Sequence, residues 1–333
     1  RALTAATASK SGPGIAARRL RMSSKGRPDA MVSYPESNEV KIASGFSALL
    51  GAHVNLIEDQ VRTMSDQLPP APPSEDKGPA LRPFAELVHA LKFLTRLPVP
   101  FSKTIDPPPL NQTMRMFSVA GALIGVLIAV VLLAGRLVQL PPLLSAILAV
   151  AAGILVTGAL HEDGFADTAD GFGGGKTRER RLEIMRDSRI GSYGALALII
   201  AVALRVAAYA SLIEFSAIAL LTIIVAAQSF SRALVVDMLW ATPPARTNGL
   251  SAYAGQPPRS IAMFAIALGL LLTLVAGYFS QFENAVLALA LGLAATAAIR
   301  WQAMRLIGGQ TGDVCGAAQV ACEVMMLIAF LAT

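Results

Sequence analysis

The sequence predicts an all-α membrane protein: a polytopic helical bundle with six or seven transmembrane helices and a disordered amino-terminal extension. Three observations predict this class. Of the 333 residues, 54% are hydrophobic and only 15% are charged, whereas about a quarter of the residues of a soluble domain are charged. The mean hydropathy is +0.56. The apolar residues also fall in long blocks, each close to the roughly 20 residues that a helix needs to cross a bilayer.

Residues 1–82 differ in composition from the rest of the chain. A Ser-Lys-Ser-Gly-Pro-Gly run lies near the start, and Pro69-Pro70-Ala71-Pro72-Pro73 lies near the end. Only residues 46–64 suit a short helix. A segment that cannot bury an apolar core stays disordered, and the chain begins with Arg1 rather than Met. We therefore expect residues 1–82 to be a disordered or non-native extension, and residues 83–333 to form one integral-membrane domain.

The first element expected in this domain is an amphipathic helix over residues 83–100, with Lys92 and Arg96 on its polar side. Such a helix typically lies in the membrane interface. Seven apolar stretches follow, and the sixth is the shortest, which predicts six or seven spans. The stretches cover about residues 117–135, 142–160, 192–212, 216–239, 261–280, 285–299 and 314–332.

The basic residues predict the orientation of the bundle. With the amino terminus inside, the inside segments of residues 83–333 hold fourteen basic residues, and the outside segments hold only Arg136. Cytoplasmic loops carry such an excess of Lys and Arg. Segments 161–191, 240–260 and 300–313 are therefore predicted to share the cytoplasmic face. The net charge of +6 fits these loops better than a nucleic-acid-binding face, which would gather its basic residues on one soluble surface.

Three aspartates follow the end of the second apolar stretch. Asp163, Asp167 and Asp170 stand at i, i+4 and i+7, so on a helix they point within about 60° of one another. Like charges at this spacing repel and destabilise a helix. A bound cation removes the repulsion, and oxygen ligands without cysteine suit Mg²⁺. We predict a site here that binds magnesium and phosphate.

The alternative for the aspartates is an ordinary solvated acidic face, which is the usual reason for a run of charges. Their position argues against it. The stripe begins where an apolar span ends, and Gly164 and Gly171 bracket it.

A glycine run and several cations follow the aspartates. Gly173-Gly174-Gly175 precedes Lys176, and Arg186 and Arg189 lie further along. Backbone amides of a glycine run and guanidinium groups both bind phosphate oxygens. Some of these cations would instead pair with nearby glutamates at the membrane surface. The segment is not a P-loop, because the spacing from the glycines to Lys-Thr differs.

His161 and two arginines inside the predicted spans are further candidates. Because histidine titrates near neutral pH, His161 is either a general base or a residue that orients the aspartates. An arginine within a span is costly and normally faces the bundle interior. Arg232, about two helical turns from the inner end of its span, would reach toward the aspartates and stabilise a phosphate. Arg205 lies deeper, and we expect a structural role in which it pairs with Glu214 or a backbone carbonyl.

A second candidate segment, residues 308–313, enters the last span. Its glycines permit close backbone approach, and Thr311 and Asp313 lie on the predicted cytoplasmic face. Glu323 lies about ten residues further on, where a carboxylate must be protonated, paired or in a polar cavity. Cys315 and Cys322 would lie roughly 10 Å apart along a helix. This distance is too great for a disulfide, so we interpret both as core residues.

Four segments carry a family resemblance: HEDGFADTADG at 161–171, RRLEIMRDSRIG at 180–191, GQTGD at 309–313 and FLTRLPVP at 93–100. In these segments the chain resembles the cobalamin synthase family, whose activity is that of an adenosylcobinamide-GDP ribazoletransferase. The resemblance covers about residues 84–333, and the first 80 residues have no counterpart in it.

The resemblance implies a Mg²⁺-dependent transferase that joins adenosylcobinamide-GDP to α-ribazole, or to its 5′-phosphate, and releases GMP. The residues implied to hold Mg²⁺ are Asp163, Asp167, Asp170 and Asp187. The implied catalytic residues are His161, Asp167 and Arg232: His161 or an aspartate takes the hydroxyl proton, and Arg232 stabilises the developing charge. The residues implied to contact the substrates are Lys176, Arg186, Arg189, Arg246, Thr311 and Asp313.

The resemblance also implies a place in the cell. We expect a multi-pass protein of the bacterial inner membrane with its active site on the cytoplasmic face. Its partners would be the two substrates and the lipid bilayer, and no nucleic acid. Association as a homo-oligomer, or with other enzymes of cobalamin synthesis, is left open by the sequence.

Two other functions are compatible with parts of the sequence. CDP-alcohol phosphatidyltransferases also place spaced aspartates at the cytoplasmic end of a span, but with Ala-Arg after Asp-Gly and a longer gap, whereas here Ala166 precedes Asp167. A transporter would line its pathway with Arg205, Arg232 and Glu323, but the spans show no inverted repeat. A purely structural membrane protein would leave the aspartates unexplained.

Overall fold

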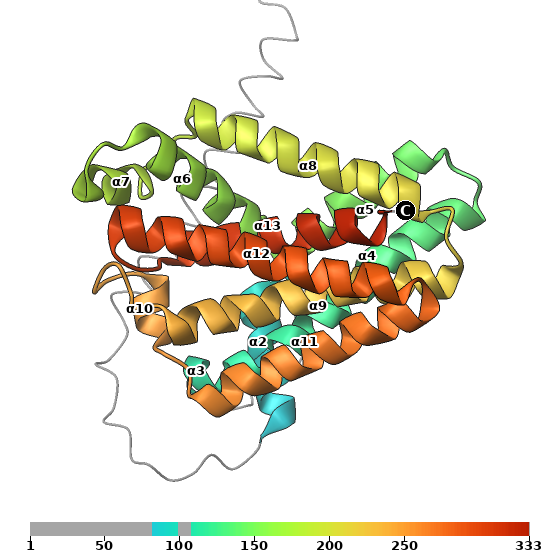
Figure 1. Ribbon diagram of the computed structural model, residues 1–333, viewed down its shortest axis with the longest axis horizontal. Helices are drawn as coiled ribbons and strands as arrows, with labels where there is room; N and C mark the ends of the chain where they lie inside the picture. Colours follow the sequence, from blue (N-terminus) through green and yellow to red (C-terminus); the bar gives the residue numbers. More distant parts are fainter. Residues whose placement is uncertain (1–81, 99–107, 333) are drawn as a thin grey trace, which may run out of the picture. The chain divides into compact units, whose positions relative to one another are not determined.

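The computed structural model of the chain describes residues 82–98 and 108–332 (Figure 1). Within these ranges the chain is helical and contains no strand, and the one isolated β-bridge there joins Pro244 and Gln310. The prediction of an all-α fold is confirmed. The predicted disordered extension falls outside the described residues, apart from its last residue, Arg82.

The described helices lie in this order: α2 (Pro83–Leu94), α3 (Leu110–Thr113), the 3-10 turn η1 (Met114–Met116), α4 (Phe117–Leu137), α5 (Pro142–Thr157), α6 (Leu160–Gly174), α7 (Arg178–Ile184), α8 (Ser192–Leu212), α9 (Ala217–Ala241), α10 (Leu250–Ala254), α11 (Arg259–Phe279), α12 (Phe282–Ile307) and α13 (Gly312–Phe330).

The described helices include six that are long and apolar enough to cross a membrane, with α3, η1 and α4 counted as one helix of 28 residues. The pair α5 and α6 supplies a seventh if this bent pair is one span. The prediction of six or seven spans is confirmed. One predicted boundary was wrong, because the stretch expected over 285–299 belongs to α12, a helix of 26 residues. Arg300 and Gln302 interrupt the apolar run, but polar residues are tolerated in the last turns of a span.

Helices α9 and α13 form the centre of the bundle. In the most apolar 18-residue stretch of each, 78% of the residues are buried, against 28% in α8 and 22% in α12. Helix α4 lies close against α9 because Gly121 and Gly125 have no side chain. A Cβ atom at Gly121 would collide with the backbone oxygen of Gln228, and one at Gly125 would lie 2.8 Å from the Cα atom of Val225. Small residues commonly allow such close approach between membrane helices.

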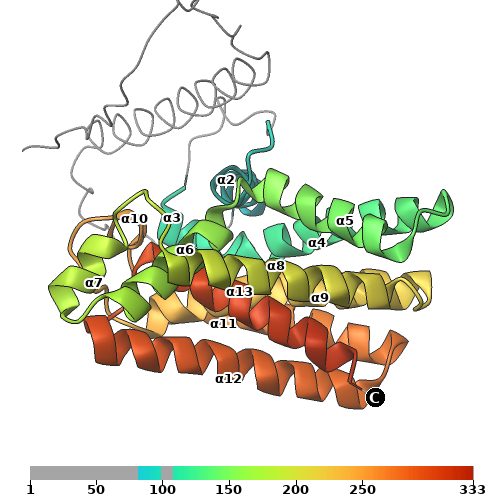
Figure 2. The same ribbon diagram turned by 90° about the horizontal axis from the view of Figure 1, so that it is seen from above.

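Helix α2 lies across the long helices, and Figure 2 shows it end-on while the spans run along the page. Its buried Glu86 forms an ion pair with Arg115 at 2.9 Å, which fixes α2 against η1. Lys92 is exposed, as expected for the polar side. The amphipathic helix predicted over 83–100 is therefore present, but it ends at Leu94.

The chain turns by 90° between α5 and α6. Gly158 and Ala159 both adopt left-handed backbone conformations, with φ of 62° and 58°. The segment after α2 packs on this turn, where the Arg96 amide donates a hydrogen bond to the Val156 carbonyl at 2.7 Å. The turn starts a new helix, α6, and the predicted stripe of aspartates lies on that helix.

Three connecting segments meet at one end of the bundle, the end that carries α6, α7 and α10 in Figure 1. Arg178 donates hydrogen bonds to the carbonyl oxygens of Ile307, at 2.8 Å, and Ala245, at 2.5 Å. The amide of Gln310 donates to the Pro243 carbonyl at 2.8 Å. The segments that the basic residues assign to one face therefore do lie together.

Candidate active site

The first turn of α6 packs directly on the first turn of α13. A Cβ atom at Gly164 would lie 2.9 Å from the Cα atom of Asp313, and one at Gly316 would lie 3.1 Å from the backbone oxygen of His161. Glycine is needed at both positions for the two helices to approach so closely. This contact joins the two segments that the sequence singles out, although they are far apart along the chain.

The contact between α6 and α13 brings three aspartates into one cluster. Asp163 and Asp167 come from α6, Asp313 comes from α13, and Asp167 is repelled by the charges of both others. Asp313 accepts hydrogen bonds from Arg246 and from the Thr311 hydroxyl, each at 3.1 Å. The Arg246 guanidinium offsets only part of the negative charge, so the cluster attracts a cation.

A cavity of about 230 Å³ lies beside this cluster. Its polar lining includes His161, Asp163, Arg246 and Asp313, while Asp167 lies one helical turn further along α6, outside the lining. Most of the remaining lining side chains are apolar. A pocket with a few convergent polar groups in an apolar surround is typical of small-molecule sites. The lining residues are Phe93, Leu94, Met114, Phe117, Leu160, His161, Asp163, Gly164, Val235, Leu239, Arg246, Ser251, Ala254, Gly312, Asp313, Cys315 and Gly316.

Two of the three clustered carboxylates are available to a metal ion. Asp313 is held by Arg246, whereas no residue in the described ranges forms an ion pair or hydrogen bond with the side chain of Asp163 or Asp167. In the same part of the chain, no three acidic, histidine or cysteine side chains form a complete metal site. Mg²⁺ usually binds through one or two carboxylates together with waters and substrate phosphates. The donors fit a magnesium ion that a bound substrate completes, and do not fit an all-protein cage.

The amino terminus of α13 supplies a positive partial charge beside the aspartates. The helix begins at Gly312, which lines the cavity. Thr311 caps it by accepting a hydrogen bond from the Val314 amide at 3.3 Å. Helix amino termini bind phosphate through their free amides and dipole. An anion in this cavity would therefore contact both the helix end and Arg246.

Asp170 lies close enough to repel Asp167, but its carboxylate is engaged elsewhere. Its two carboxylate oxygens accept hydrogen bonds from the amides of Gly191, at 2.7 Å, and Gly194, at 2.9 Å. It thereby caps the start of α8 from a neighbouring helix. The structure does not bring Asp170 to the same site as Asp163 and Asp167.

The predicted phosphate-binding residues of the 176–189 segment lie at the same end of the bundle but do not line the cavity. Lys176 is exposed. Arg186 donates to the Asn248 side chain at 2.8 Å. Asp187 pairs with Arg189 at 2.7 Å, and the hydrogen bonds from Arg189 lower the pKa of Asp187 to about 2. The structure therefore gives Asp187 a surface ion pair and does not place it with the clustered aspartates.

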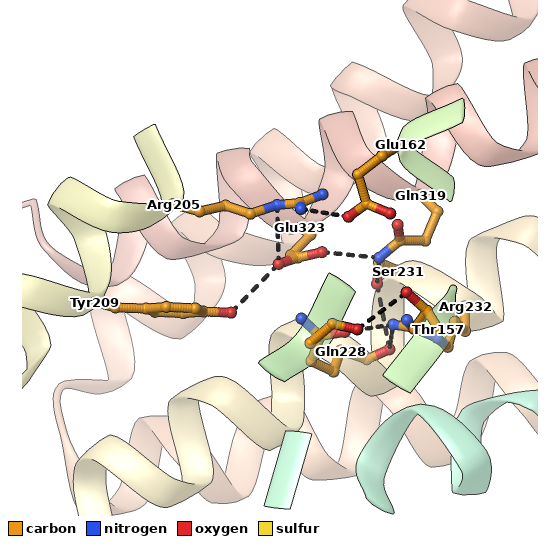
Figure 3. Close-up of polar contacts among 10 residues, drawn as sticks. Thr157, Glu162, Arg205, Tyr209, Gln228, Ser231, Arg232, Gln319 and Glu323 are labelled. Atoms are coloured by element: carbon orange, nitrogen blue, oxygen red, sulfur yellow. Dashed lines mark hydrogen bonds and ion pairs between the residues drawn. The ribbon is translucent and has the colours of Figure 1, made fainter. Parts of the chain in front are cut away.

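A second polar group lies deeper in the bundle, next to the aspartate cluster (Figure 3). Arg205 of α8 lies 2.6 Å from Glu162 of α6 and 3.3 Å from Glu323 of α13. Glu323 also accepts a hydrogen bond from Gln319 at 2.9 Å. These ion pairs agree with the structural role expected for Arg205, but the prediction that it pairs with Glu214 was wrong. Glu214 lies beyond the end of α8 and is exposed, whereas Arg205 is buried within the helix bundle and contacts two other carboxylates there.

Arg232 belongs to this inner group and not to the lining of the larger cavity. Its side chain is buried and donates hydrogen bonds to the backbone and side-chain oxygens of Gln228, at 3.0 and 2.5 Å. His161 lines both the larger cavity and a small inner one that Arg232 also lines. His161 is thus the residue through which the two polar regions adjoin.

Comparison with known proteins assigns the chain to a family. A sequence model of the cobalamin-5-phosphate synthase family matches residues 86–331. The chain belongs to this family. No solved structure matches it.

Several relatives of this cobalamin-5-phosphate synthase family member carry the name adenosylcobinamide-GDP ribazoletransferase. The relative from Azorhizobium caulinodans is 46% identical over 254 residues, which is 75% of this chain and 96% of the relative. A relative from Sinorhizobium is 42% identical and covers 74% of this chain and 96% of its own length. One from Bradyrhizobium diazoefficiens is 44% identical, with 73% and 92% covered. Family membership rules out the phosphatidyltransferase and transporter alternatives.

Only some of the predicted site residues in the family motifs lie together in the structure. The predicted residues that the structure brings together are His161, Asp163, Asp167, Arg246, Thr311 and Asp313; those placed elsewhere are Asp170, Lys176, Arg186, Asp187, Arg189 and Arg232. Sequence reasoning missed the pairing of Glu162 with Arg205. An arginine inside a span needs a carboxylate partner, and Glu162, at the inner end of the acidic segment, was the available signal.

Proposed function

We propose that this chain joins adenosylcobinamide-GDP to α-ribazole, or to α-ribazole 5′-phosphate, and so forms adenosylcobalamin or its 5′-phosphate with release of GMP. The family and the shared name of the relatives support this reaction. One observation supports placing this reaction in the cavity. Two aspartates of α6, neither of them paired within the described residues, lie beside the amino terminus of α13 and Arg246, an arrangement suited to a metal-bound diphosphate.

In the proposed reaction, a hydroxyl of the ribazole attacks the phosphorus atom that is linked to cobinamide. A new phosphorus–oxygen bond forms, and the bond from that phosphorus to the oxygen of GMP breaks. GMP leaves with the electron pair. Asp163 and Asp167 would hold Mg²⁺, which, when bound, neutralises phosphate charge and makes the phosphorus more electrophilic. Arg246 and the start of α13 would bind phosphate oxygens and position them for the attack.

The proton of the attacking hydroxyl must be removed during the transfer. His161 is buried and lines the cavity next to Asp163. We propose two roles that the geometry supports equally: it accepts the proton, or it orients the aspartates. The pH profile of His161→Gln distinguishes them, because loss of a general base removes the limb of the rate profile that reports its titration.

The lining of the cavity and its place at one end of the bundle both agree with the proposed substrate. The cavity is lined by Phe93, Met114 and Phe117 as well as by charged groups. Its charged groups would bind the diphosphate end of that substrate. We propose that the protein lies in the bacterial inner membrane with this end in the cytoplasm, as the excess of basic residues there indicates.

The proposal is tested with membranes that contain the full chain. They are incubated with adenosylcobinamide-GDP, α-ribazole and Mg²⁺, and GMP and adenosylcobalamin are quantified by chromatography. We expect equal amounts of both products, and no product after EDTA until Mg²⁺ is restored. Membranes that contain folded protein but form neither product would overturn the transferase assignment. Product formation that persists in EDTA would overturn the magnesium assignment alone.

A further inference from the structure

Four charged side chains from four helices meet in the interior of the bundle. Glu162 comes from α6, Arg205 from α8, Arg232 from α9 and Glu323 from α13 (Figure 3). Arg205 contacts both carboxylates, at 2.6 and 3.3 Å. Two arginines and two glutamates balance in formal charge. We refer to these four residues as the inner charge cluster.

Polar side chains complete the surroundings of Glu323. Tyr209 donates to one of its carboxylate oxygens at 3.4 Å and Gln319 donates to the other at 2.9 Å. The amide of Gln319 also donates to Ser231 at 3.1 Å. Buried ion pairs rarely add net stability over apolar residues of similar size, because removing charges from water is costly. A role in fixing the relative positions of the four helices therefore explains the cluster better than a gain in stability does.

A small cavity of about 20 Å³ lies within the inner charge cluster and is lined by all four of its residues. Four buried atoms of the cluster have no hydrogen-bond partner in the part of the chain that the structure describes: Nε and Nη2 of Arg205, Nε of Arg232 and Oε2 of Glu162. A buried water needs a polar site of about this size and makes about three hydrogen bonds. One water that accepts from both arginines and donates to Glu162 would join the two halves of the cluster.

The cluster lies directly behind the candidate active site. Glu162 precedes Asp163 on α6, and Glu323 lies on α13, the helix that starts with Asp313. The guanidinium of Arg205 thus ties the helix that carries two of the clustered aspartates to the helix that carries the third. The glycine contact at Gly164 brings the backbones together, but glycine alone does not fix the rotation of α6 about its axis.

We propose that Arg205 is a positioning residue: by holding Glu162 and Glu323 at once, it fixes α6 on α13 and so holds the metal-binding aspartates of α6 in place against Asp313 and the start of α13. This inference rests on the proposed function. Outer residues of this kind, which hold metal ligands in place, typically change metal affinity or activity by about 10- to 100-fold when they are mutated. Arginine suits the task because two different nitrogens of its planar group reach two carboxylates, whereas lysine offers a single charged atom.

Arg205→Lys in the full-length protein, purified in detergent, is the main test. It keeps the buried positive charge but reaches only one carboxylate at a time. Binding of Mn²⁺, used as a probe for Mg²⁺, is measured by electron paramagnetic resonance, and the transfer rate is measured over a range of Mg²⁺ concentrations. We expect Mn²⁺ binding to weaken about tenfold and half-maximal activity to need about tenfold more Mg²⁺. Excess Mg²⁺ should restore most of the maximal rate, which it would not do for a protein that is only less stable.

The control is a second ion pair between two helices, which is partly exposed and joins Arg300 of α12 to Asp237 of α9. It does not involve α6. Arg300→Lys should leave Mn²⁺ affinity within about twofold of the unmodified protein, even if the melting temperature falls, because no metal-binding side chain depends on this pair. Glu323→Gln is the second test variant, since it keeps the size of the side chain and removes one contact of Arg205. It should shift Mn²⁺ binding in the same direction as Arg205→Lys.

The outcomes separate this inference from the proposed function. If the unmodified protein binds Mn²⁺ and forms cobalamin, but Arg205→Lys and Glu323→Gln bind Mn²⁺ as tightly as it does, the positioning role is wrong. A shift of equal size in Arg300→Lys would also overturn it, because the effect would then be general. If the unmodified protein neither binds Mn²⁺ nor forms cobalamin, the proposed function fails before the variants are compared.

Discussion

The four aspartates predicted to bind metal differ in what their carboxylates contact. Asp163 and Asp167 have no partner among the described residues, whereas Asp170 accepts two backbone hydrogen bonds and Asp187 pairs with Arg189. A carboxylate without a protein partner leaves its oxygens free to bind a cation. We therefore expect the four to respond differently to the same substitution.

Asp167→Asn should lower the transfer rate by about 100-fold or more, because a neutral amide is a poor ligand for Mg²⁺ and the remaining aspartates cannot replace it. The measurement is GMP release by the purified protein at saturating substrates. Folding should not suffer, since the substitution removes repulsion from Asp163 and Asp313. A melting temperature at or above that of the unmodified protein would confirm this.

Asp187→Asn is the matched control, because it is the same chemical change at an aspartate in the segment between α7 and α8. Its ion pair with Arg189 lies at the surface, where such pairs contribute little to stability. The rate should stay within about twofold of the unmodified protein. A rate that falls as far as in Asp167→Asn would show that Asp187 belongs to the metal site after all.

Gly158 and Ala159 adopt the left-handed conformation that lets α6 start in a new direction. Gly158→Ala should lower the free energy of unfolding by about 1–2 kcal/mol, because side chains at left-handed φ are strained. A Cβ atom there would also lie 2.5 Å from Nε of Arg96. Ala159→Gly should be neutral or stabilising by up to about 1 kcal/mol, since it relieves the same strain. Denaturation in detergent measures both, and a loss of stability in Ala159→Gly would contradict the assignment.

For single residues, the sequence identifies candidate metal ligands better than it predicts what each of them contacts. The i, i+4, i+7 spacing identified Asp163 and Asp167, but it also included Asp170. Asp170 points to the same side, but it lies about 10 Å further along the axis than Asp163, where the start of α8 supplies two amides. Periodicity predicts a shared face and does not say which neighbouring element covers part of it.

Among the elements, the close pair α4 and α9 depends on the missing side chain at Gly121. Gly121→Ala should lower the free energy of unfolding by about 1–3 kcal/mol, because the added methyl group collides with the backbone oxygen of Gln228, which cannot move aside like a flexible side chain. Thermal unfolding in detergent is the measurement.

Gly174→Ala is the control for this prediction. It is also a helical glycine, but the nearest atom to its added Cβ would be 3.6 Å away, in the side chain of Ile184. The change in stability should stay within about 0.5 kcal/mol. Equal losses in both variants would contradict this explanation, because alanine favours a helix more than glycine does and propensity alone would stabilise both.

Helix lengths and order could be predicted from the sequence because apolar runs of about 20 residues are characteristic of membrane-spanning helices. The break between α5 and α6 could not. Ala159 is a good helix former, and no property of this residue type indicates a left-handed turn. The break arises from tertiary contacts, in which α6 packs on α13 and the segment after α2 packs on the turn.

For the molecule as a whole, the charge asymmetry predicts which end faces the cytoplasm. Lys176 is exposed at the end that carries the candidate active site, and Gln139 is exposed in the loop between α4 and α5. The native cysteines, Cys315 and Cys322, are buried. A cysteine introduced at either exposed position should therefore be the main target of a maleimide that does not cross membranes.

K176C should react in inverted membrane vesicles and stay unmodified in intact spheroplasts, and Q139C should show the reverse. The physical reason is that positively charged loops are retained on the cytoplasmic side during insertion. Charged diphosphates cross a bilayer very poorly, so a site that takes a GDP-linked substrate must open where that substrate is made. Labelling of K176C from outside the cell would therefore contradict the predicted orientation. It would also require the active site to receive its nucleotide substrate from the outer side, which the proposed cytoplasmic reaction does not allow.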